Sequence, residues 1–225
     1  IRDPAVAPDG KTIAVVSDGP DPTKSNVVLQ RVNAANGKMT KVPVAEQPPY
    51  GHQDPAWRPD GRFLLYVRNA REGGRGAPTI WRYEPKTKKS SRLSRTGYTE
   101  PGYSPNGRYL VATRTNSLGT DVVVLDGNGN ELVRVTSDGR SWGGAWSPDG
   151  TQIAFLRLVG SNVELAVATI GRGAGATLEV EEIEPLTEES GLDAASRPAW
   201  WGPRPTPEPT PSAPASPAAE PTPAP

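Results

Sequence analysis

Short apolar runs recur along the chain, each shortly after a Pro-Asp-Gly or Pro-Asn-Gly tripeptide. The runs lack the 3.6-residue spacing of a helix and have the length of strands. The prolines of the tripeptides lie 51, 46 and 43 positions apart, so the chain repeats itself at a nearly constant period. The prolines are Pro8, Pro59, Pro105 and Pro148, and the runs are 13–16, 63–67, 109–112 and 153–156.

The tripeptide has the chemistry of a hairpin turn. Proline sets φ at the first central position, Asp or Asn caps the turn, and Gly takes the left-handed position of a bulged hairpin. Because turn geometry explains the middle residue fully, we expect it to serve the fold rather than a metal. The middle residues are Asp9, Asp60, Asn106 and Asp149.

Each hairpin is followed by two more strand-like runs around a second turn, so one repeat is four short antiparallel strands. A lone sheet of this size leaves two faces uncovered, and radial stacking buries them against neighbouring sheets. A period of about 40–50 residues with four strands per unit is typical of a β-propeller. The additional strands are expected at 27–32 and 39–44, 79–83 and 90–93, 121–125 and 131–136, and 163–170 and 178–186.

The expected fold is therefore an all-β propeller with four recognisable blades, at about 3–44, 54–94, 100–136 and 143–188. A fifth repeat start at 197–201 predicts one extra inner strand. The sequence Gly-Ala-Trp-Ser-Pro-Asp-Gly at 144–150 resembles the PD40, or WD40-like, repeat of TolB-type propellers. That resemblance implies a ring of six or more blades, of which these would be a part, while a closed ring of four remains the alternative.

The amino-acid composition limits the kinds of site and function that the chain can have. The 25 basic and 25 acidic residues cancel, which disfavours nucleic-acid wrapping. The absence of cysteine excludes a disulfide framework, a thiolate metal site and a cysteine nucleophile. The one histidine, His52, lies in a polar stretch, and we expect it to face solvent. No apolar run approaches the ~18 residues that a membrane-spanning helix needs.

The segment 202–225 differs in composition from the rest. Ten of the 23 residues from Pro203 onward are proline and none is a large apolar residue, so this tail cannot form a core. We expect a disordered, polyproline II tail after a propeller over 1–201. Its role is either an inert linker, a cell-surface stalk or a ligand for a proline-binding module. Because the chain begins with Ile1 and has Met39 as its only methionine, we expect a processed product or a piece of a longer protein.

An acidic residue precedes the motif proline in three repeats, as Asp3, Asp54 and Glu100. The resemblance places these positions at the start of the innermost strand, near one mouth of the central channel. A ring of carboxylates there would bind calcium or the basic end of a peptide. Alternatively, each carboxylate accepts backbone N–H bonds in its own loop. Gly143 and Arg197 interrupt the ring in the fourth and fifth repeats.

Charge is unevenly spread along the chain. Eleven basic residues fall within 58–95 against three acidic ones, and seven acidic residues fall within 179–193 with no basic one. The basic stretch predicts a polyanion-binding edge, solvated blade edges that resist aggregation, or one pole of a contact between chains. The candidate polyanion patch consists of Arg68, Arg71, Arg75, Lys86, Lys88 and Lys89.

Aromatic residues recur at one position of the repeat, where we expect them to form a packing layer between blades. Gly-Arg-Ser-Trp-Gly at 139–143 matches the Gly-x-Ser-x-Gly nucleophile motif, but that motif needs a strand–turn–helix context and a partner histidine. We therefore interpret the match as chance and predict no catalytic residue. The recurring aromatics are Trp57, Tyr103, Trp146 and Trp200, whereas Trp142 and Trp201 fall outside the layer and are expected to be exposed.

The resemblance implies a non-catalytic scaffold or recognition module of the bacterial cell envelope, outside the cytoplasm. Protein or peptide partners are expected, with no cofactor apart from the calcium considered above and no nucleic acid. Two alternatives stay open: a substrate-gating propeller of a prolyl oligopeptidase-type peptidase, or a polyanion- or glycan-binding propeller that uses the basic edge at 58–95.

Overall fold

The computed structural model describes residues 1–18, 27–45, 51–69 and 78–202. Within these residues, 16 strands form four antiparallel sheets, each built from four consecutive strands. The first sheet contains β1 (Arg2–Val6), β2 (Thr12–Asp18), β3 (Val27–Asn33) and β4 (Met39–Lys41), and the second β5 (His52–Trp57), β6 (Leu64–Arg68), β7 (Thr79–Glu84) and β8 (Lys89–Arg92). The third contains β9 (Tyr98–Tyr103), β10 (Tyr109–Asn116), β11 (Gly119–Asp126) and β12 (Glu131–Arg134), and the fourth β13 (Ser141–Trp146), β14 (Gln152–Val159), β15 (Asn162–Arg172) and β16 (Leu178–Pro185).

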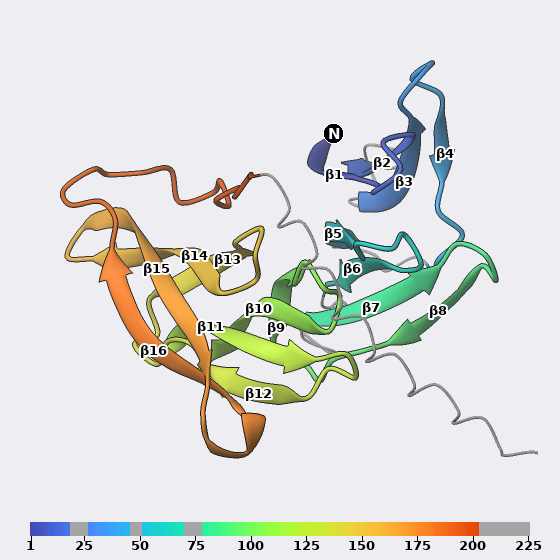
Figure 1. Ribbon diagram of the computed structural model, residues 1–225. Coiled ribbons are helices and arrows are strands. Elements are labelled where there is room, and N and C mark those ends of the chain that lie inside the picture. Colours follow the sequence, from blue (N-terminus) through green and yellow to red (C-terminus); the bar gives the residue numbers. More distant parts are fainter. Residues whose placement is uncertain (19–26, 46–50, 70–77, 203–225) are drawn as a thin grey trace, which may run out of the picture.

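The sheets are the blades of a propeller, as the sequence predicts. The first strands of the sheets, β1, β5, β9 and β13, contact one another in that order around a common axis (Figure 1). β1 and the segment 186–202 lie at the two ends of this arc of blades (Figure 1). The segment 197–201 forms no strand, which contradicts the expected fifth inner strand.

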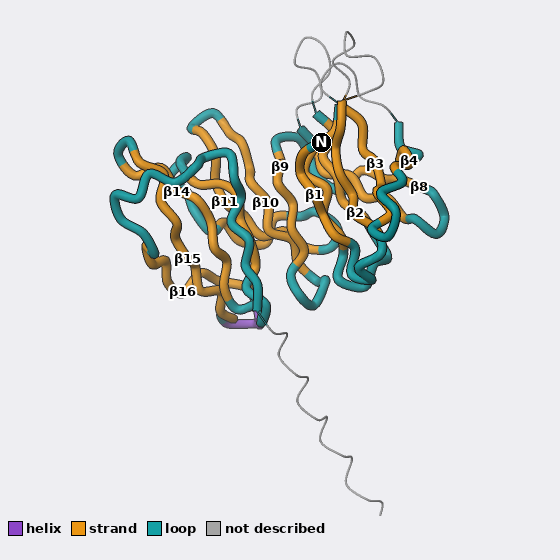
Figure 2. The backbone as a smooth tube through the Cα atoms, turned by 90° about the horizontal axis from the view of Figure 1, so that it is seen from above, coloured by secondary structure: helices purple, strands orange, loops and turns teal. Residues whose placement is uncertain are grey.

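Helix is scarce in the described part of the chain. It consists of one 3-10 turn, Ala174–Ala176, in the glycine-rich connection between β15 and β16 (Figure 2). No helix in the described ranges has the length and apolar character of a membrane span.

The hairpin turns have the predicted chemistry. The middle side chain of each Pro-Asp/Asn-Gly tripeptide accepts a hydrogen bond from the backbone N–H two positions later, at 2.9–3.0 Å in all four blades. The glycine that follows has φ between +67° and +76°, a region that residues with a Cβ avoid. These contacts join Asp9 to Lys11, Asp60 to Arg62, Asn106 to Arg108 and Asp149 to Thr151.

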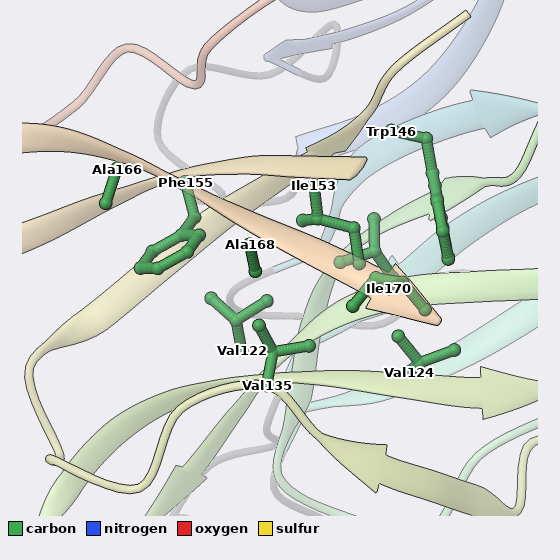
Figure 3. Close-up of a cluster of buried hydrophobic side chains, with 10 residues drawn as sticks. Val122, Val124, Val135, Trp146, Ile153, Phe155, Ala166, Ala168 and Ile170 are labelled. Carbon is green, nitrogen blue, oxygen red and sulfur yellow. The ribbon is translucent and has the colours of Figure 1, made fainter. Parts of the chain in front are cut away.

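Three hydrophobic clusters lie between successive blades and form the core. In the cluster between the third and fourth blades, Phe155, Ile153 and Ala168 face Val122 and Val124 across the gap between the sheets (Figure 3). A second cluster joins the first two blades around Leu29 and Tyr66, and a third joins the middle two around Leu65 and Val123. Each interior sheet is therefore covered on both faces by its neighbours, which is what a propeller requires.

Candidate functional site

The repeated acidic position lies at a bulge in each inner strand. Asp3, Asp54 and Glu100 have φ of +52°, +52° and +50°, and Gly143 at the equivalent place has φ of +70°. The pairing register shifts at this point in all four inner strands. A left-handed conformation costs a residue with a Cβ about 1–2 kcal/mol, so surrounding contacts must hold it.

Those contacts link one blade to the next. The backbone N–H of Asp54 donates to Asp3 Oδ2 at 3.4 Å, that of Glu100 to Asp54 Oδ2 at 2.9 Å, and that of Gly143 to Glu100 Oε2 at 3.0 Å. Each carboxylate thus accepts a hydrogen bond from the equivalent residue of the following blade. These N–H donors come from the following blade and not from the carboxylate's own loop, which was the alternative expected from the sequence.

The carboxylates are therefore spaced around the axis by the blades and engaged in inter-blade contacts. In the part of the chain that the structure describes, no three Asp, Glu or His side chains gather as ligands for a metal ion. Among the described residues, the observed role of these three acidic side chains is to link one blade to the next.

Asp54 has an unusual protonation equilibrium. Burial raises the pKa of its carboxyl from 3.8 to about 6, assisted by the nearby Glu100 and Asp3 carboxylates. The N–H of Glu100 and the Arg197 guanidinium oppose this rise in the pKa. The middle link of the chain of contacts therefore changes charge near neutral pH.

Arg197 takes the place that the sequence repeat assigns to the next acidic residue. Its Nη2 donates to the carbonyl oxygen of Gly144 at 3.0 Å and its Nη1 to that of Pro101 at 3.5 Å. Its stem lies against Gly143, where a Cβ would approach Arg197 Cγ to 3.6 Å. The sequence indicated this residue only as an interruption of the acidic ring, and its role as a bridge between two inner strands depends on tertiary contacts.

A cavity of about 490 Å³ lies on the axis, between the bulges and the Pro-Asp-Gly turns. All four inner strands and the segment 197–202 contribute to its wall, which is mainly proline and aromatic. Arg197 is the one charged side chain among the described residues that line it. The aromatic lining residues are Trp57, Tyr103, Trp146, Trp200 and Trp201, and the prolines are Pro8, Pro55, Pro59, Pro101, Pro105 and Pro148.

The recurring aromatics combine two roles. Trp57, Tyr103 and Trp146 each pack on a different inter-blade cluster, which confirms the predicted packing layer for these three. They also line the axial cavity, a role that the repeat alone did not indicate. Trp201 is 89% exposed, as expected, whereas Trp142 is half-buried and its Nε1 donates to the Ala194 carbonyl oxygen at 3.0 Å.

The described residues of the candidate polyanion patch lie apart in the structure. Arg68 pairs with Thr79 at one end of β7, where its guanidinium lies 4.4 Å from the centre of the Trp81 ring. Lys86, Lys88 and Lys89 are exposed at the turn beyond the other end of β7. Arg71 and Arg75 lie outside the described residues. The described members therefore do not form one surface.

His52 is buried, so the expectation that it faces solvent is wrong. It begins β5 with 1% exposure, its Nε2 lies 3.1 Å from the Ala45 carbonyl oxygen, and its ring meets Tyr66 edge-on at 5.2 Å. Ser141 of the Gly-x-Ser-x-Gly match is also buried, at the start of β13, and its hydroxyl donates to Asp138 at 3.0 Å. Neither residue has the setting of a nucleophile elbow.

The comparisons with known proteins agree with this architecture. No family model matches the chain. A region of 85 residues is 36% identical to the Tol-Pal system protein TolB of Anaeromyxobacter dehalogenans, and it covers 37% of this chain but 19% of that protein. The crystal structure of TolB from Acinetobacter baumannii matches with a TM-score of 0.61 and 24% identity, over 80% of this chain and 42% of that one.

Other propellers share the fold. A structure assigned as TolB from Agrobacterium tumefaciens matches with a TM-score of 0.62 and 17% identity, over 80% of this chain and 64% of that one. An acylaminoacyl peptidase matches with a TM-score of 0.54 and 14% identity, so the fold also occurs in enzymes. The chain is thus a β-propeller. More particularly, its repeat and its similarities make it a TolB-like β-propeller, and it spans less than two thirds of each of these relatives.

Proposed function

We propose that this propeller is a non-catalytic recognition module that binds protein or peptide partners in its axial cavity. The observation that carries the proposal is the wall of the cavity, where aromatic and proline side chains from four blades surround about 490 Å³. This volume lies in the range of ligand sites, which are mostly apolar with a few convergent polar groups. Extended peptides with apolar side chains suit such a wall.

The setting that we propose is the bacterial cell envelope, outside the cytoplasm. The similarity to Tol-Pal system proteins supports it, although it covers only 37% of the chain. A fusion of alkaline phosphatase to the protein expressed with its natural upstream sequence tests this setting. Phosphatase activity is expected, since the enzyme is active only after export, and an inactive but stable fusion would contradict it.

Peptide binding is tested by selection from a random peptide library on the full chain. Selected peptides are expected to bind the wild-type protein and to lose at least tenfold in affinity with Trp200→Ala, measured by calorimetry. Trp200 suits this test because it lies in the wall but outside the three inter-blade clusters. Trp142→Ala is the matched control, because Trp142 is not in the wall. Equal affinity of the peptides for both variants would exclude the cavity as the site.

The polyanion-binding alternative has less support from the structure. Its described residues lie at opposite ends of β7, and Arg68 is engaged with Trp81. A gating role in a peptidase has the support of the shared fold alone.

A further inference from the structure

The wall of the axial cavity has the chemistry of a groove that binds proline-rich chains. Aromatic-lined grooves recognise polyproline II segments, whose stiff form loses little entropy on binding. Trp200 and Trp201 stand on one side of the cavity and Trp57, Tyr103 and Trp146 on the inner strands. The 89% exposure of Trp201 leaves a large apolar surface at the cavity in contact with solvent.

The indole N–H groups of the wall are used unequally. Trp57 Nε1 donates to the Ala5 carbonyl oxygen of the preceding blade at 3.1 Å. Trp146 is 8% exposed, and its Nε1 is buried without a hydrogen-bond partner among the described residues. A buried donor of this kind is costly unless an acceptor reaches it. Because it is buried, the Trp146 N–H is out of reach of a ligand, and Trp146 contributes apolar surface to the wall.

Arg197 gives the cavity its polarity. Its guanidinium lies between the inner-strand residues Pro101 and Gly144, toward the bulges. Gly202 lies at the opposite end, where a Cβ would meet Pro148 of a Pro-Asp-Gly turn at 3.0 Å. A carboxylate carried by a proline-rich chain would therefore complement the single cation of the wall.

The chain itself contains such a segment, and it starts at the cavity. Residues 203–225 follow Gly202 directly and contain ten prolines and two acidic residues, Glu208 and Glu220. Glu208 is six positions beyond Gly202, too close along a stiff polyproline chain to turn back to Arg197. Glu220 is 18 positions beyond and allows the return. Tethering makes this encounter intramolecular, with a high effective concentration.

We propose that the distal tail, residues 214–225, docks in the axial cavity of its own chain, with Glu220 facing Arg197. The prolines lie on the tryptophan side chains that line the cavity. The docked tail competes with external peptides for the same wall. This inference rests on the proposed function, because it uses the same cavity.

Energy transfer in the full chain tests the docking. The chain has no cysteine, so Ser216→Cys takes one dansyl-type acceptor, and four of the six tryptophans line the cavity. Strong transfer from tryptophan is expected, independent of protein concentration. Glu220→Gln is expected to lower the transfer at least twofold at low salt, and Glu208→Gln, the same change in the same tail, to leave it unchanged. Both substitutions lie in 203–225 and leave the sequence of the described blades unchanged, so loss of folding does not confuse the result.

Three results would overturn the inference. They are transfer that Glu220→Gln does not change, transfer that both variants lower equally, and transfer that rises with protein concentration, which would assign the cavity to the tail of a second copy. Failure here is distinct from failure of the proposed function. If library peptides bind wild type and Glu220→Gln with equal affinity and still depend on Trp200, the cavity binds peptides and the tail does not compete.

Discussion

At the residue scale, one repeated acidic position has the sequence pattern of a ligand-binding site, but its side chains make hydrogen bonds between blades. Asp3, Asp54 and Glu100 lie at equivalent places near the start of β1, β5 and β9, as a ring of ligands would, yet each accepts the N–H of the next blade. All three residues have a positive φ, at the bulge of the inner strand. An acceptor for a backbone donor requires only a carboxylate or amide oxygen, which makes the role of negative charge at this position open to test.

The substitution Asp54→Asn removes the titratable charge but keeps an acceptor oxygen for the hydrogen bond, so it shows the effect of the charge alone. Folding raises the Asp54 pKa from 3.8 to about 6, so the native state binds the proton more tightly than the unfolded state. The resulting contribution to stability is complete below pH about 4 and is lost as the pH rises through about 6. Relative to Asp54→Asn, the wild-type protein should lose about 2 kcal/mol of unfolding free energy between these limits.

Urea unfolding of both proteins at several pH values measures this difference. The same substitution at Asp149 serves as the control. Hydrogen bonds from Ser147 and Thr151 lower the pKa of Asp149, so its contribution to stability should change with pH in the opposite direction. A difference between wild type and Asp54→Asn that stays flat from pH 4 to 7 would show that Asp54 titrates normally.

Two tryptophans at the same repeat position should respond differently to the same change. Trp57→Phe removes the hydrogen bond to the Ala5 carbonyl oxygen, and about 1 kcal/mol of stability is expected to be lost with it. Trp146→Phe removes an indole N–H that has no hydrogen-bond partner among the described residues. Because no hydrogen bond is lost, this change should cost clearly less stability than Trp57→Phe. Thermal unfolding with matched baselines compares the two, and an equal loss in both would contradict the assignment.

At the scale of elements, local chemistry was predictable and tertiary surroundings were not. The Pro-Asp-Gly turns and the strands that flank them follow from residues adjacent in sequence. His52 is buried because Ala45 and Tyr66 close over it, and no local pattern carries that information. The segment 197–201 has the sequence of an inner strand but forms none, because a strand also needs a bonded neighbour. Antiparallel pairing also places Arg68 and Lys89 at opposite ends of β7, so the described residues of the candidate polyanion patch lie apart.

The inter-blade clusters determine how strongly an element is held. Phe155 in β14 is fully buried against the third blade, and truncation leaves a cavity there. Phe155→Ala is expected to cost about 3–5 kcal/mol of unfolding free energy. Leu118→Ala, at a residue 84% exposed in the β10–β11 turn, is the control and should change stability by less than about 0.5 kcal/mol. Denaturant unfolding of both variants measures the two losses of unfolding free energy. Similar losses at the two positions would refute the assignment of the core to the blade interfaces.

At the scale of the whole molecule, each described blade contacts its neighbours along the arc, and no cluster spans all four. Stability in such an array is approximately a sum of blade terms and nearest-neighbour terms. The hydrogen-bonded links from Asp3 to Gly143 run through all the blades, but each joins only a successive pair. A substitution that weakens one interface should therefore destabilise only the two blades that share it, unless these hydrogen bonds couple the blades strongly.

Hydrogen exchange on two variants tests how far damage spreads. Leu29→Ala weakens the cluster between the first and second blades and should accelerate amide exchange in β2 and β3 more than tenfold, because about 2–5 kcal/mol is lost there. Exchange in β14 and β15 should change less than about twofold, since their cluster is separate. Phe155→Ala should give the reverse pattern. Equal acceleration in all four blades by either variant would mean that the inter-blade hydrogen bonds make the propeller a single cooperative unit.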